Sequence, residues 1–359
     1  MEKILVYGMT DNPGGIETYL INAAQQLSGK VQFDFVTDFP SIAHEEALKK
    51  MGSKFYFIPP KGKKLLAHIN GMFKILKAHP EYKTVYFNLL DAGGAITELA
   101  PWLLRRRIVT HSHNNNTEKV KLHRLCKPFL KLFTSGQVAC SAVAADYMFG
   151  ENNNALIIPN AIEARKFVFN EEIRKSKRRE LGLTDELTVC HVGRLSMQKN
   201  PFRMLDIMSA LTKKIPNAVL LSVGTGELER EVHDYADKIG VSKNVRFLGR
   251  RNDVEELLQA ADVFFLPSLY EGFGICIIEA EAAGLNCVVS KGIPEEVNIT
   301  GRVTFVSLDA SDDDWAEALA SNVSQNRTDC TSYFIESGYD SEHTDTKNRE
   351  LLKMLTASK

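Results

Sequence analysis

The sequence predicts an α/β protein made of two doubly wound domains that face each other across a cleft. Three observations lead to this prediction. The chain has 359 residues, about twice the usual length of one domain. Short apolar, β-branched runs alternate with longer segments of helical periodicity. Several of these runs are apolar almost throughout, as expected for parallel strands that helices cover on both faces.

The expected strands form two groups along the chain. Those of the first half are KILVYG (3–8), VQFDFVT (31–37), TVYFN (84–88), RIVTHS (107–112), QVACS (137–141) and ALIIPN (155–160). Those of the second half are LTVCHVG (187–193), AVLLSVG (218–224), VRFLG (245–249), DVFFLP (262–267) and NCVVS (286–290). Because ligands bind at the carboxyl ends of parallel strands in such sheets, we expect the functional residues there.

A polar, charged stretch, residues 164–186, lies between the two groups. It is typical of a domain connection followed by the first helix of a new domain. The predicted domains are therefore residues 1–165 and residues 166–345.

Composition and the first residues of the chain favour a cytoplasmic protein. Lys plus Arg is 44 and Asp plus Glu is 45, and this balance argues against a general nucleic-acid binder. The first residues, MEKILVYG, indicate a strand and lack the features of a signal peptide, and no run is apolar and long enough to span a membrane. The six cysteines are scattered without a CxxC pair, which predicts reduced core residues.

The most informative segment is LPSLYEGFGICIIEAEAAG (266–284). A strand ends at Pro267, a glycine-rich loop follows, and a helical pattern begins at Ile275. Glycines let backbone N–H groups approach a ligand, and a helix start adds partial positive charge, so a diphosphate would suit this turn. Glu279 could then accept hydrogen bonds from ribose hydroxyls, and Glu271 from sugar hydroxyls. The alternative is a plain strand-to-helix turn with two solvated glutamates.

The pair Glu271-x7-Glu279 within EGFGICIIEAEAAG resembles the signature of the retaining GT-B glycosyltransferases of family 4 (group 1). The resemblance covers nearly the whole chain. It implies two Rossmann-like domains, a hexosyl donor in the form of a UDP-sugar, no cofactor and no metal. It also implies that residues 346–359 form a helix that packs back on the first domain. The donor-binding residues that it implies are Gly15, Arg194, Lys199, Gly224, Gly249, Arg250, Glu271, Gly272, Phe273, Gly274, Ile275 and Glu279.

Further segments follow in the order expected for the family. VGRLSMQKNP (192–201) resembles its phosphate-binding segment, in which Arg194 and Lys199 contact the donor diphosphate. Two cations just after a strand end can neutralise such a leaving group. VGTGELE, with Gly224, resembles the next strand-end turn, and the backbone at Gly249 and Arg250 is expected to hold the uracil ring. Without these neighbours, two solvated cations would be the simpler interpretation.

The N-terminal half supplies the remaining candidates. Asn12-Pro13-Gly14-Gly15 precedes a helical pattern and resembles the family's GG loop, with Gly15 toward the donor and Gly14 on the acceptor side, although a simple turn would also use these glycines. THSHNN (110–115) ends a strand, and the family has a histidine here that contacts the donor sugar. We favour His113 over His111, because it lies further from the strand; Asn114 is assigned to the acceptor side. A metal site is the competing interpretation, but no Cys, Asp or Glu within the segment completes one.

Two basic amphipathic segments are KGKKLLAHINGMFKILK (61–77) and KVKLHRLCKPFLKLF (119–133). In the second, one set of apolar residues follows helical spacing with four cations opposite. That set is Leu122, Leu125, Cys126, Phe129, Leu130 and Phe133. The segments either cover their own sheet or face an anionic membrane surface, which would make the enzyme peripheral on the inner face of the plasma membrane.

The predicted reaction is transfer of a sugar from a UDP-sugar to an oligosaccharide or lipid-linked acceptor, with Glu271, His113 and His111 as catalytic candidates. SKGIPEEVNITGRVTFVSL (290–308) resembles a subgroup associated with capsular and exopolysaccharide assembly. The acidic run at residues 312–314 indicates a helix start and not a metal motif. Two alternatives stay open, a nucleotide-sugar 2-epimerase and a non-catalytic nucleotide-sugar-binding regulator. A dinucleotide dehydrogenase is disfavoured because the first turn reads GMTDNPGG.

Overall fold

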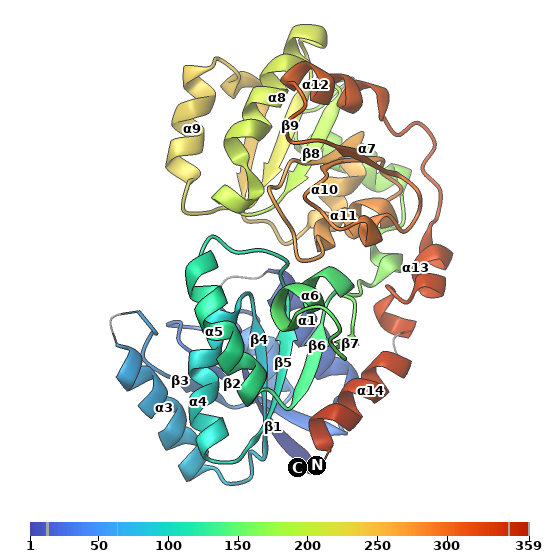
Figure 1. Cartoon of the computed structure of the whole chain (residues 1–359). Coiled ribbons are helices and arrows are strands. Elements are labelled where there is room, and N and C mark those ends of the chain that lie inside the picture. Colours follow the sequence, from blue (N-terminus) through green and yellow to red (C-terminus); the bar gives the residue numbers. More distant parts are fainter. Residues whose placement is uncertain (12–13, 63, 344, 358–359) are drawn as a thin grey trace. The chain divides into compact units, whose positions relative to one another are not determined.

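The chain divides into two compact units, Met1–Asn160 with Thr344–Lys359, and Ala161–His343. The computed structural model describes residues 1–11, 14–62, 64–343 and 345–357. Each unit contains one parallel sheet with helices on both faces (Figure 1). The predicted two-domain α/β fold is confirmed.

The first unit has a seven-stranded sheet in the order β3-β2-β1-β4-β5-β6-β7. Its strands are β1 Glu2–Tyr7, β2 Val31–Thr37, β3 Phe55–Phe57, β4 Thr84–Leu89, β5 Arg107–Ser112, β6 Gly136–Ala139 and β7 Leu156–Ile157. Its helices are α1 Gly15–Gln26, α2 Glu45–Lys50, α3 Leu65–Ala78, η1 Ala92–Gly94, α4 Ala95–Leu103, α5 Val120–Phe133, α6 Ala142–Phe149 and α14 Asp345–Thr356.

The inner strands β1, β2, β4 and β5 of this sheet are buried on both faces. Along β1, Ile4 and Val6 pack with α1, α2 and α14, whereas Leu5 and Tyr7 pack with α3, α4, α5 and α6. This alternation follows from the two-residue period of a strand. Helix α14 is also bonded to the sheet, because Thr84 Oγ1 donates to the Leu355 carbonyl at 2.9 Å.

The second unit has a six-stranded sheet in the order β10-β9-β8-β11-β12-β13. Its strands are β8 Thr188–Val192, β9 Val219–Val223, β10 Val245–Gly249, β11 Val263–Leu266, β12 Cys287–Ser290 and β13 Val303–Val306. Its α-helices are α7 Glu171–Glu180, α8 Pro201–Lys214, α9 Glu229–Lys238, α10 Val254–Ala260, α11 Ile275–Ala282, α12 Asp312–Ser321 and α13 Thr331–Ser337. Its 3-10 helices are η2 Ala164–Phe167, η3 Met197–Lys199, η4 Ser242–Asn244, η5 Glu295–Val297 and η6 Ser341–His343.

The second unit begins at Ala161, somewhat before the expected residue 166. The reason lies in the contacts of the connecting segment. Ile162 forms a β-bridge with Asp340, and the backbone N–H of Ala164 donates to the Asp340 carboxylate at 3.0 Å. These bonds attach the connection to the second unit.

The acidic run at residues 312–314 forms the first turn of α12, as predicted, and Ser311 closes a capping box with Asp314. Two strands, β3 and β13, were not predicted. Among the described residues, no helix is both long and apolar enough to cross a bilayer.

Candidate functional site

Three loops at the carboxyl ends of β8, β9 and β10 are bonded to one another through their backbones. The N–H of Gly193 donates to the Val223 carbonyl at 2.9 Å, and the N–H of Gly224 donates to the Gly249 carbonyl at 2.8 Å. Gly224 has a φ of +127°, and a Cβ there would lie 2.2 Å from the Gly193 carbonyl oxygen. Only glycine allows this approach, so Gly224 keeps the two loops in contact.

A buried ion pair joins the loop after β8 to the loop after β11. Lys199 Nζ donates to Glu271 Oε1 at 2.6 Å, and the two side chains are 15% and 7% exposed. Burial acts to lower the pKa of Lys199, but the Glu271 carboxylate outweighs it and raises that pKa above its ordinary value. Lys199 is therefore a fixed cation at neutral pH. Arg194, which is exposed, lies near enough to repel it.

Two amides that the sequence analysis missed position this pair. Gln198 Nε2 donates to the Tyr270 carbonyl at 3.1 Å, and Asn200 Nδ2 donates to the Pro267 carbonyl at 3.2 Å. They attach the 3-10 helix that carries Lys199 to the loop that carries Glu271. Both stand in the quoted segment VGRLSMQKNP, where their amide chemistry was the available signal.

The loop after β11 leads into α11. Gly274, with a φ of +96°, is the N-cap of α11, and Ile275 is its first residue. Phe273 is buried and stacks on Tyr339 with ring centroids 5.0 Å apart. Gly272 is also buried in this loop. This packing fixes the loop beside the first turn of α11, where the backbone N–H groups of a helix have no acceptor within it.

Glu279 lies in α11, about one turn from its start. Burial, with a smaller contribution from Glu255, raises the pKa of its carboxyl to about 8. Within the described part of the chain, no group donates a hydrogen bond to this carboxyl. A desolvated acceptor of this kind suits a ligand that brings its own hydroxyl donors. Strand β10 ends at Gly249, which has a φ of +61°, and the exposed Arg250 follows it.

In the first unit, both candidate histidines are buried at the end of β5, with ring centroids 3.9 Å apart. Asn88 settles the tautomer of His113. Its Nδ2 donates to the Tyr7 carbonyl at 3.3 Å, so its Oδ1 accepts from His113 Nε2 at 2.9 Å. The Nδ1 atom of His113 is then an acceptor; it is buried and has no partner among the described residues.

His111 belongs to a different chain of hydrogen bonds. Its Nδ1 lies 2.6 Å from the Tyr86 hydroxyl, which lies 2.8 Å from the Tyr19 hydroxyl. In the part of the chain that the structure describes, its Nε2 has no partner. Burial lowers the pKa of His113 to about 3, and burial, with a smaller contribution from His113, lowers the pKa of His111 well below its ordinary value. Both rings are therefore neutral. The sequence analysis missed Asn88, Tyr86 and Tyr19; only Asn88, at the end of a strand, gave a signal.

The glycine loop precedes α1. Gly14 is its extended N-cap residue and Gly15 its first residue, whereas Asn12 and Pro13 lie outside the described residues. The buried Glu17 accepts from the Thr10 backbone N–H at 2.9 Å and from the Thr10 hydroxyl at 2.8 Å. Asn114 is buried and accepts from the N–H of Asn115 at 3.1 Å.

Comparisons with known proteins agree along the chain. Residues 173–339 match the family model of glycosyl transferases group 1, and residues 13–166 match that of Glycosyltransferase Family 4. The chain is 30% identical to EpsF of Bacillus subtilis (strain 168) over 335 residues, which cover 86% of this chain and 84% of EpsF.

Two further similarities concern part of the chain and its fold. The chain is 37% identical over 138 residues to the UDP-Gal:alpha-D-GlcNAc-diphosphoundecaprenol alpha-1,3-galactosyltransferase of Escherichia coli, with 37% of this chain and 36% of that enzyme covered. The structure of Anabaena Alr3699/HepE in complex with UDP and glucose superposes with a TM-score of 0.82 at 20% identity, and 100% of both chains is covered.

Proposed function

We propose that this chain, which belongs to the group 1 glycosyltransferases of family 4 and has their GT-B fold, transfers a sugar from a UDP-sugar to a lipid-linked oligosaccharide acceptor. The transfer retains the anomeric configuration and needs no metal, and it serves capsular or exopolysaccharide synthesis. The observation that carries this proposal is the buried Lys199–Glu271 pair at the strand ends of the second unit.

The leaving group sets the first chemical requirement. Departure of UDP from an oxocarbenium-like sugar places negative charge on the diphosphate. Lys199 is a fixed cation beside the loop that leads into α11, and Arg194 is exposed nearby. The first turn of α11 adds backbone N–H donors. Together these groups can stabilise the charge that a divalent ion stabilises in other enzymes.

The carboxylates serve recognition. The charge of Glu271 is neutralised by Lys199 while the two are paired. Its second carboxylate oxygen can still accept a hydrogen bond from a sugar hydroxyl. Glu279 can accept from the ribose hydroxyls. In the first unit, Nδ1 of His113 is an acceptor for a hydroxyl of a sugar substrate.

Two relatives support the choice of donor and acceptor. The name of the E. coli enzyme gives a UDP-sugar donor and a diphosphoundecaprenol-linked acceptor, and HepE was crystallised with UDP and glucose. The similarity to EpsF supports the polysaccharide role.

A panel of UDP-, GDP- and ADP-sugars in EDTA tests this proposal. We expect the purified protein to release UDP from one UDP-sugar, and a polyprenyl-diphosphate-linked sugar acceptor to increase the release. NMR of the product should show the donor's anomeric configuration. Strict dependence on added Mg²⁺ would contradict the metal-independent mechanism, free sugar as the main product would indicate an epimerase, and failure to bind any nucleotide sugar would overturn the proposal.

Glu279 predicts a pH dependence of UDP binding. Ribose hydroxyls bind the ionised carboxyl better, and a carboxyl with a pKa of about 8 is mostly protonated at neutral pH. The affinity for UDP should therefore increase about eightfold from about pH 7 to about pH 8.5, as the ionised fraction rises. Isothermal titration calorimetry at the two pH values measures the affinity for UDP. Glu279→Gln, which cannot ionise, is the matched control, and an equal pH dependence in both proteins would exclude Glu279 as its source.

A further inference from the structure

Helix α5 exposes an apolar strip on its outer side. Its inner side buries His123, Cys126, Leu130 and Phe133 against the first unit. The apolar set of the sequence analysis is thus divided, since only three of its six members are buried. The exposed apolar side chains of α5 include Leu122, Leu125, Phe129 and Leu132, which are 42%, 67%, 52% and 60% exposed. One helix face cannot bury every apolar residue in this sequence, so these remain in solvent.

The strip continues onto the end of α4. Trp102 and Leu103 are 36% and 53% exposed. The Trp102 ring lies 5.0 Å from the Phe133 ring, which in turn lies 6.2 Å from the Phe129 ring. We call Trp102, Leu103, Leu122, Leu125, Phe129 and Leu132 the apolar strip. A continuous apolar surface of this kind marks an interaction site on a soluble domain.

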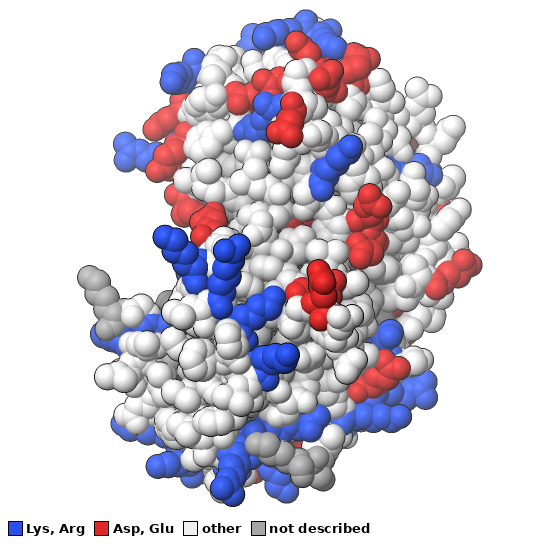
Figure 2. Space-filling view, viewed as in Figure 1, with Lys and Arg blue, Asp and Glu red and all other residues white. Residues whose placement is uncertain are grey.

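Cations border the strip along α5. With a helical step of about 100° per residue, Lys121 falls directly beside the strip, and Arg124 and Lys131 fall further round on the exposed side of the helix. Lys127 falls opposite the strip, and residues 119–133 contain no acid. Figure 2 shows Lys and Arg side chains gathered over α5. Among the described residues, neither Arg124 nor Lys131 takes part in an ion pair.

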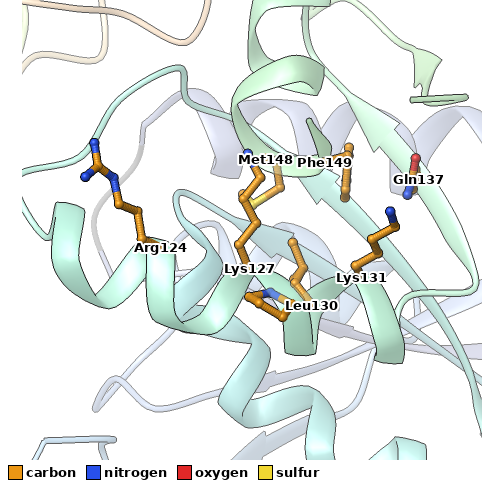
Figure 3. Close-up of a pocket in the computed structure, with 8 residues that line it drawn as sticks. Arg124, Lys127, Leu130, Lys131, Gln137, Met148 and Phe149 are labelled. Carbon is orange, nitrogen blue, oxygen red and sulfur yellow. The ribbon is translucent and has the colours of Figure 1, made fainter. Parts of the chain in front are cut away.

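Three of these cations line a groove of about 390 Å³ beside α5 (Figure 3). Its lining residues are Arg124, Lys127, Pro128, Leu130, Lys131, Gln137, Met148 and Phe149. Three of these carry positive charge and none is acidic. Lys127 also donates to the Tyr147 carbonyl at 2.7 Å, which holds it against α6. The groove is therefore open to an anionic group of phosphate size.

We propose that α5 docks this chain on an anionic lipid bilayer. The apolar strip enters the boundary between headgroups and acyl chains, and the bordering cations bind lipid phosphates. A second copy of the chain is a poorer occupant, because a two-fold contact would place like charges opposite one another. The inference depends on the surface of α5 alone, and it goes beyond the proposed donor and acceptor.

Vesicle binding tests the inference in the absence of any sugar donor. We expect the full-length protein to float with vesicles of phosphatidylcholine and phosphatidylglycerol at low salt, and to bind pure phosphatidylcholine far less. Phe129→Ser should lower the partition coefficient at least tenfold. Phe57→Ser is the matched control, because Phe57 is also 52% exposed and lies on β3 of the same unit. Arg124→Glu with Lys131→Glu should abolish binding to anionic vesicles.

Tryptophan fluorescence provides a second readout. Of the two tryptophans, Trp102 lies in the strip, whereas Trp315 is fully buried in the second unit. Anionic vesicles should therefore shift the emission of Trp102 to the blue, and lipids with a quencher near the headgroup should quench it. Unchanged thermal unfolding of Phe129→Ser would show that the variant folds.

Three results would overturn the inference. They are equal binding to neutral and anionic vesicles, equal effects of Phe129→Ser and Phe57→Ser, and a concentration-dependent dimer that Phe129→Ser abolishes without vesicle binding. Release of UDP with a water-soluble acceptor should be the same for Phe129→Ser and the wild type. A failure of vesicle binding thus leaves the proposed transfer reaction intact, and a failure of transfer leaves vesicle binding intact.

Discussion

Replacement of Lys199 by Ala is expected to lower the rate of sugar transfer by about 10²–10³-fold, the usual cost of removing one group that stabilises transition-state charge. The substitution removes the fixed cation and also leaves Glu271 buried without its partner at 2.6 Å. Glu271→Gln keeps the shape of the side chain but removes the charge that holds Lys199. The double variant should lose little more than Lys199→Ala alone, because the two side chains act as one unit.

The measurement is kcat and KM for UDP release from the active donor, with Lys214→Ala as the matched control. Lys214 is a lysine of the same unit, paired with Glu317 at 2.7 Å, but its pair is exposed. An exposed pair contributes little, so Lys214→Ala should change neither the rate nor the stability appreciably. If Lys199→Ala and Lys214→Ala have the same kcat, the Lys199–Glu271 pair does not have the proposed role in transfer.

The sequence predicted the sheets well because parallel strands buried on both faces are recognisable as apolar runs. All the expected strands occur; β2, β5 and β10 have the expected ends, and the ends of the others are displaced. Strand β3 was missed because two of its three residues are only partly buried and Phe57 is exposed, and β13 because three of its four residues are partly exposed. Such short edge strands depend on their neighbours for definition, and periodicity cannot detect them.

The residue types of the candidate site could be predicted from the sequence, but not which of these residues bond to one another. Lys199 and Glu271 stand in motifs at strand ends, yet they are 72 positions apart, and no spacing rule predicts that they bond. Asn88 and His113 come from different strands, β4 and the end of β5, and meet because those strands are neighbours. The exposed strip of α5 was not predicted either, because the sequence does not show which side of a helix its sheet covers.

The second large effect is expected when Gly8 is replaced, because Gly8 lies against the backbone of Asn88, which orients His113. Gly8 follows β1 with a φ of +115°, and a Cβ there would lie 2.1 Å from the Asn88 carbonyl oxygen. The clash is with backbone, so no side chain can rotate away to relieve it. Gly8→Ala must therefore separate the ends of β1 and β4 and displace Asn88, which orients His113.

We expect Gly8→Ala to lower the free energy of unfolding of the first unit by about 3–5 kcal/mol, the range of a buried steric clash added to backbone strain. Gly29→Ala separates the two contributions. Gly29 has a φ of +77° in the same unit, but a Cβ there would meet no described residue within 4 Å apart from its own chain neighbours. Its cost should be the strain alone, about 1 kcal/mol.

Urea denaturation of the two variants and the wild type measures the difference. Whatever Gly8→Ala protein remains folded should also transfer sugar more slowly than Gly29→Ala protein, since only the first substitution moves Asn88 and so frees the His113 ring to change its tautomer. Equal unfolding free energies for Gly8→Ala and Gly29→Ala would mean that the ends of β1 and β4 can separate without loss of stability. In that case Asn88 would not be the residue that fixes the tautomer of His113 and leaves its Nδ1 as an acceptor.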